Sequence, residues 1–145
     1  MTILKSTGNP DIDKAHETMA RMMYSIIRHT ENGHSVEELK KELLNLYAVA
    51  EEHFKDEEEL MHEIDYQFTP THIMAHEDIL SKIRIFLEIL EHSKKDYNVL
   101  VSTLLKVIEK HVEHYDVALF LYNEHHWESK QAGIQGQGAS GSLPS

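Results

Sequence analysis

One stripe of core-type residues, spaced alternately four and three positions apart, runs through the second quarter of this chain. Positions three and four apart share one face of an α-helix, so the spacing predicts a long helix with a continuous buried face. Two members, His53 and Glu57, are polar, although the rest of the stripe is apolar. A buried carboxylate needs a neutralising partner, and a metal ion would provide one. The members are Leu39, Leu43, Leu46, Ala50, His53, Glu57, Leu60 and Ile64.

The rest of the chain has the same helical periodicity, and no segment alternates apolar and polar residues as a half-buried strand would. Gly33 is predicted to end a first helix, Ser35 and Glu38 form a capping box for a second, and Pro70 opens a third. The predicted helices span 11–30, 35–64, 69–92 and 97–127. Short connections between them predict an all-α, up-down-up-down four-helix bundle over residues 1–131. Residues 132–145, rich in Gly, Ser and Gln, are predicted to be a flexible tail or linker.

Composition excludes several classes of function. The chain has no cysteine, which rules out disulfides, thiolate metal sites and iron–sulfur clusters. Its 25 acidic and 14 basic residues give a formal net charge of −11, which repels phosphate, so a nucleic-acid partner is not expected. We find no apolar run long enough for a membrane span or a secretory leader. These features predict a cytoplasmic protein without membrane insertion.

Histidines occupy core-facing positions on the other predicted helices as well. His72 and His76 lie four positions apart on the third helix, and His16 shares a face with the core methionines of the first. His111 continues the apolar stripe of the fourth helix, and Asp116 follows five residues later. Five histidines and two carboxylates are too many ligands for one tetrahedral ion, but they suit two octahedral ions that share carboxylate bridges. Nitrogen and oxygen ligands without sulfur favour iron or manganese over structural zinc.

The spacing leaves two points open. On an ideal helix the five-residue step from His111 turns Asp116 by about 140°, so we predict a π-type distortion between them. An undistorted helix there would argue against Asp116 as a ligand. The carboxylate of the second helix is also open, because the spacing favours Glu57 but allows Glu58 or Glu59.

Four segments of the chain resemble motifs of the hemerythrin family, in particular those of its bacterial members. Each segment alone is a weak match, but the four in order at spacings compatible with a bundle are specific. The segments are Ile12-Asp13-Lys14-Ala15-His16, His53-Phe54-Lys55-Asp56-Glu57-Glu58, His72-Ile73-Met74-Ala75-His76 and His111-Val112-Glu113-His114-Tyr115-Asp116.

This resemblance implies a non-haem di-iron centre that binds dioxygen reversibly, for carriage, storage or supply, and that is not an enzyme. The two iron ions would be joined by an oxo or hydroxo group, and dioxygen would occupy the open position on the iron with fewer histidines. Ile108, one turn before His111, is the candidate wall of an apolar ligand pocket. The implied ligands are His72, His76 and His111 on one iron, His16 and His53 on the other, and Glu57 and Asp116 as bridges.

Other interpretations use the same residues. The runner-up is a sensor of oxygen, redox state or nitric oxide, coupled to an output domain or another partner. A ferritin-like di-iron protein needs a Glu-x-x-His motif on each of two helices, and only Glu59 and His62 fit, away from the stripe. A bundle that serves only as an interaction module is disfavoured by polar residues on every buried face. The histidines predicted to be ordinary surface or locally paired residues are His29, His34, His62, His92, His114, His125 and His126.

Overall fold

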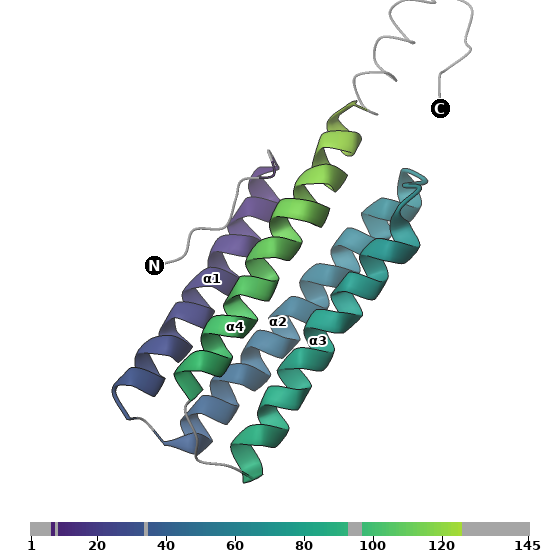
Figure 1. Ribbon diagram of the computed structural model, residues 1–145. Coiled ribbons are helices and arrows are strands. Elements are labelled where there is room, and N and C mark those ends of the chain that lie inside the picture. Colours follow the sequence, from purple (N-terminus) through teal and green to yellow (C-terminus); the bar gives the residue numbers. More distant parts are fainter. Residues whose placement is uncertain (1–6, 8, 34, 93–96, 126–145) are drawn as a thin grey trace, which may run out of the picture.

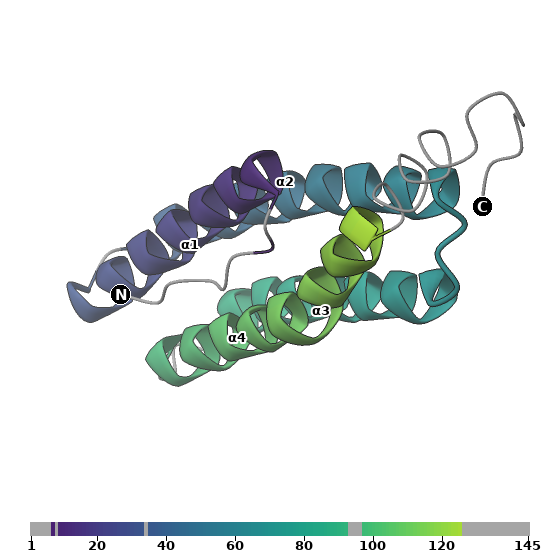
Figure 2. The same cartoon turned by 90° about the horizontal axis from the view of Figure 1, so that it is seen from above.

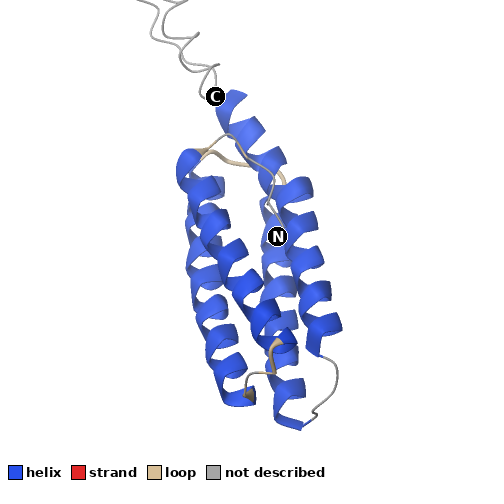
Figure 3. Ribbon diagram, turned by 90° about the vertical axis from the view of Figure 1, so that its left-hand side faces the viewer, coloured by secondary structure: helices blue, strands red, loops and turns tan. Residues whose placement is uncertain are grey.

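The computed structural model describes residues 7, 9–33, 35–92 and 97–125, with only the backbone at 97 and 98. Its helices are α1 (Pro10–Glu31), α2 (Val36–Glu63), α3 (Thr69–His92), α4 (Tyr97–His111) and the π-helical turn η1 (Val112–Asp116), after which residues 117–125 are again helical. Figure 3 shows helices and loops and no strand among these residues. Residues 126–131, the end of the predicted domain, and residues 132–145, the whole of the predicted tail, lie outside the described residues.

Successive helices run in opposite directions, as Figure 1 shows. Helix α1 packs against α2 and α4, and α3 packs against the same two helices. Seen from above, α1 and α2 form one layer and α3 and α4 the other (Figure 2). The predicted all-α, up-down-up-down bundle is therefore confirmed. Within the described part of the chain, no helix is both long and apolar enough to cross a bilayer.

Local capping explains where the helices begin and end. The Asn9 side chain accepts hydrogen bonds from the backbone N–H groups of Asp11 and Ile12, at 3.0 and 3.2 Å. The Ser35 hydroxyl accepts one from the N–H of Glu38 at 3.2 Å, which is the cap predicted from the sequence. Gly33, between α1 and α2, has a φ of 72°, which glycine adopts without strain. The predicted boundaries of α1, α2 and α3 are thus correct to within one residue.

The buried face of α2 follows the predicted stripe, with one correction. Leu60 was predicted to lie in the core, but it is only half-buried, and its neighbour Met61 is buried instead. A straight helix has 3.6 residues per turn, so a seven-residue repeat drifts by about 20° per heptad. Over a helix as long as α2 this drift moves the buried position by one residue.

The core consists of two apolar clusters at different heights in the bundle. The larger one includes Met23 of α1, Leu46 of α2 and Ile83 of α3, and the smaller one includes Met61 and Leu119. On α1 and on α4 with its extension, the buried polar residues fall between the members of these two clusters along the helix. On α2, His53 lies beside Phe54 at the end of the larger cluster, and Glu57 lies between Phe54 and Met61. A polar layer therefore lies in the bundle with apolar packing on both sides.

Candidate metal centre

The structure brings all seven predicted ligand residues together in this polar layer. Each is at most 6% exposed, although imidazoles and carboxylates are normally solvated. Their ligand atoms fall into two groups, in each of which all atoms lie within 4.8 Å of one another. The three-histidine group contains Glu57, His72, His76, His111 and Asp116, and the two-histidine group contains His16, His53, Glu57 and Asp116. We call all seven residues together the seven-residue centre.

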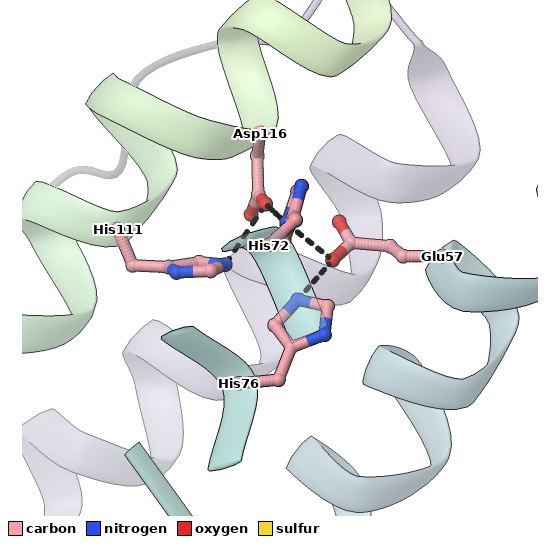
Figure 4. Close-up of side chains that lie close together, drawn as sticks. All are labelled: Glu57, His72, His76, His111 and Asp116. Atoms are coloured by element: carbon pink, nitrogen blue, oxygen red, sulfur yellow. Dashed lines mark hydrogen bonds and ion pairs between the residues drawn. The ribbon is translucent and has the colours of Figure 1, made fainter. Parts of the chain in front are cut away.

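Glu57 belongs to both groups because its two oxygens face different histidines. Its Oε1 lies 2.9 Å from Nε2 of His76 and 3.7 Å from Nε2 of His72, both on α3. Its Oε2 lies 3.4 Å from Nε2 of His53, one turn earlier on α2. Figure 4 shows Glu57 reaching toward the α3 histidines from the neighbouring helix. The carboxylate therefore spans the two groups.

Asp116 divides its oxygens in the same way. Its Oδ1 lies 3.0 Å from Nε2 of both His72 and His111, which belong to the three-histidine group. Its Oδ2 lies 3.0 Å from Nε2 of His16, which belongs to the other group. Each carboxylate thus presents one oxygen to each group, the arrangement expected of a ligand that bridges two metal ions.

The π-helical turn aims Asp116 into the centre. In η1 the N–H of Val117 bonds to the carbonyl of Val112, five residues earlier, where an α-helix would make a bond to the residue four earlier. The distortion predicted between His111 and Asp116 is confirmed. It brings two residues that an ideal helix would turn apart by about 140° onto the same face.

The buried atoms of the centre fit a metal ion better than they fit one another. Among the described residues, Nε2 of His16, His53 and His111 and one oxygen each of Glu57 and Asp116 are buried without a well-formed hydrogen bond, despite the short distances above. Imidazole nitrogens and carboxylate oxygens are electron-pair donors that suit iron-type ions. An ion between them would accept the lone pairs left without a partner.

The histidines determine the charge state of both carboxylates. Burial by itself would raise the pKa of Glu57, and the nearby Asp116 adds to this effect, but the three neighbouring imidazoles of His53, His72 and His76 outweigh both and lower it. Burial acts against the ionised form of Asp116 too, and three histidines again lower its pKa well below the ordinary value. Both carboxylates are therefore ionised and available as ligands near neutral pH.

The imidazoles differ from one another. Burial would lower the pKa of His72, but its hydrogen bond with Asp116 at 3.0 Å and the nearby negative charge of Glu57 raise it to about 9. The pKa of His53 is also raised, because Glu57 outweighs the effect of burial. Burial dominates at His111 and lowers its pKa. In the metal-free protein the centre therefore holds protons that a metal ion would displace.

Two contacts of the centre were not predicted from the sequence. Glu58, one of the alternatives to Glu57, lies outside both groups, but its Oε2 contacts Nδ1 of His76 at 2.9 Å. Phe54 stacks on the His76 ring with centroids 4.0 Å apart and an interplanar angle of 7°. The third candidate of the acidic run, Glu59, is exposed.

Ile108 is buried at 2% exposure in the larger apolar cluster. A surface cleft of about 760 Å³ between α3 and α4 reaches His111 and Tyr115, but Ile108 is not among its lining residues. The role of Ile108 as the wall of a ligand pocket stays a prediction.

The remaining histidines behave as expected where they are described. Nδ1 of His29 pairs with Glu42 of α2 at 2.7 Å. Both Glu59 and His62 are exposed, so the ferritin-like motif does not reach the core. His34 and His126 lie outside the described residues. The exposed histidines are His62, His92, His114 and His125.

Fold and centre together define a four-helix bundle with a buried histidine and carboxylate metal-binding site. The chain is 27% identical over 123 residues to the bacteriohemerythrins of Campylobacter jejuni subsp. jejuni serotypes O:6 and O:2, an alignment that covers 82% of this chain and 90% of each relative. No protein-family model matches the chain. No solved structure matches it either. The predicted resemblance to hemerythrins is confirmed by these relatives.

Proposed function

We propose that the chain binds two iron ions in the seven-residue centre and uses them to bind dioxygen reversibly, as a carrier, store or supply protein and not as an enzyme. The observation that carries this proposal is the division of Glu57 and Asp116, each with one oxygen toward either group. One ion alone would not use both oxygens of two carboxylates in this way. The similarity to bacteriohemerythrins supports iron as the metal.

The unequal groups would give the two ions different roles. Besides the shared carboxylates, one group has three histidines and the other has only His16 and His53. The two-histidine side therefore offers one protein ligand fewer, and an iron ion held there would have a position left for dioxygen. When bound, the iron pair supplies the electrons that reversible dioxygen binding requires.

The chain's own residues keep this chemistry reversible. The seven side chains come from all four helices and are held between two apolar clusters, so the ligands are preorganised and bulk water is excluded. Excluding water limits proton access to the bound ligand, and proton access promotes irreversible oxidation. The near-complete burial of Glu57 and Asp116 is the feature that a water-accessible metal site would lack.

The test is to measure iron per chain and the visible spectrum, first under argon after reduction and then in air. Two irons per chain, with a charge-transfer band that appears in air and disappears on deoxygenation, are expected. Glu57→Gln should lose iron, whereas Glu59→Gln, an exposed neighbour on the same helix, should keep it. Two irons that oxidise without reversal would overturn dioxygen carriage and favour redox sensing. Fewer than two irons would overturn the di-iron centre itself.

A further inference from the structure

Two consecutive glutamates hold both ring nitrogens of one histidine. Nε2 of His76 lies 2.9 Å from Oε1 of Glu57, and its Nδ1 lies 2.9 Å from Oε2 of Glu58. Both glutamates project from α2, whereas His76 projects from α3. Since Glu57 faces the centre, Glu58 contacts the nitrogen on the far side of the ring.

His76 differs in this respect from other histidines of the centre. Nδ1 atoms of His16, His72 and His111 are buried, and in the described part of the chain none has a hydrogen-bond partner. An imidazole that coordinates through Nε2 carries its proton on Nδ1, and a carboxylate acceptor there makes the ring a stronger ligand. Glu58 is placed to supply such an acceptor.

The ring plane of His76 is fixed as well. Phe54 stacks on it with the rings nearly parallel, at 4.0 Å between centroids. Stacking restricts tilting of the ring, and the hydrogen bond to Glu58 restricts a flip that would exchange the two nitrogens. Together, Phe54 and Glu58 leave His76 one orientation, with Nε2 toward Glu57.

We propose that Glu58 is a positioning residue for the metal centre. It accepts the Nδ1 proton of His76, holds the Nε2 lone pair toward the three-histidine group, and adds negative charge on that side of the ion pair. The inference rests on the proposed di-iron function. The Glu58 side chain is 28% exposed, so through it the buried His76 ring is linked to a carboxylate that is in contact with solvent.

Substitutions at Glu58 separate its hydrogen bond from its charge. Glu58→Ala removes both and should weaken iron retention against a chelator by about 10- to 100-fold, the usual effect of losing such a partner. Glu58→Gln keeps an acceptor oxygen, so its iron retention should stay close to that of the parent chain. Both variants should move the midpoint potential of the iron pair in the positive direction, because the lost charge had stabilised the oxidised state. Glu59→Ala, at the exposed neighbouring position, is the matched control.

A purely structural role for Glu58 predicts a different pattern. It would lower the thermal unfolding midpoint of the metal-free variants and leave the potential where it is in the parent chain. Equal iron retention and equal potential in Glu58→Ala and Glu59→Ala would overturn the proposal. A parent chain that holds two irons but does not bind dioxygen reversibly would overturn the proposed function and leave this comparison fully informative.

A measurement that needs no iron tests the proposal in case the chain retains none. Long-range ¹H–¹⁵N NMR spectra of the metal-free full-length chain report which nitrogen of His76 carries the proton. A proton on Nδ1 in the parent chain, lost or redistributed in Glu58→Ala, supports the proposal even if the chain retains no iron. The same tautomer in both proteins would count against it.

Discussion

Raising the pH should destabilise the metal-free protein, and His72 determines the direction. Its pKa in the folded chain is about 9, above the ordinary value of 6.5, because Asp116 and Glu57 stabilise the imidazolium. A group whose pKa is raised by folding contributes stability that is complete below pH 6.5 and is lost as the pH rises through about 9. His53, whose pKa is also raised, acts in the same direction. His111, with a lowered pKa, acts only at more acidic pH.

The size of the effect follows from the two pKa values of His72. The interval from 6.5 to about 9, at about 1.36 kcal/mol per pH unit, corresponds to about 3 kcal/mol of folding free energy. This is an upper value, because Glu57 is shared with His53 and His76. For a chain of this size, a loss of about 3 kcal/mol lowers the melting temperature by roughly 10 °C.

The assay is urea denaturation of chelator-treated protein at several pH values between 6.5 and 9.5. His72→Asn should flatten the decline, whereas His62→Asn, at an exposed position, should preserve it. Iron should bind more tightly as the pH rises over the same interval, because it must displace the His72 proton. A free energy of unfolding that stays constant or increases over this range in the metal-free parent chain would refute the reasoning.

Three further predictions concern the framework of the centre. Leu43→Ala, at a fully buried position, should lower the free energy of unfolding by about 2–5 kcal/mol, and Leu44→Ala, at a position that is 56% exposed, by less than about 0.5 kcal/mol, both measured by urea denaturation. Deleting the exposed Glu113 should convert η1 into α-helix and preserve iron content, since a four-residue step leaves Asp116 within about 40° of the direction of His111. Inserting one alanine after Lys106 should abolish iron binding, because it turns both His111 and Asp116 by about 100° relative to the preceding part of α4. Retention of iron by the insertion variant would contradict this account of the helix register.

The location of the centre could be predicted because helical periodicity is regular. Glu57 lies 18 residues after Leu39, which is five full turns of an ideal helix, so the two residues share a face. A carboxylate on an otherwise apolar face is conspicuous in sequence. The five-residue step to Asp116 was informative for the same reason, since only a local change of helix type could bring that side chain inward.

Contacts that depend on side-chain reach could not be predicted in this way. Glu58 lies about 100° around the helix from Glu57, where periodicity assigns it to the solvent side. Its side chain nevertheless reaches Nδ1 of His76 on the neighbouring helix α3, at 2.9 Å. The stacking of Phe54 on His76 depends likewise on how far α2 is shifted along its axis relative to α3. The spacing of residues within either helix gives no information about this shift.

The distribution of the centre over the whole chain determines when it can form. Asp116 belongs to both ligand groups and lies 100 residues after His16 in the sequence, and no pair of adjacent helices contains either complete group. A nascent chain therefore has no complete group until η1 has been synthesised and has docked against the earlier helices. Metal binding is therefore a late step, which requires that all the helices have assembled in the correct topology. An incorrectly assembled bundle would be recognisable because it would not retain the ions.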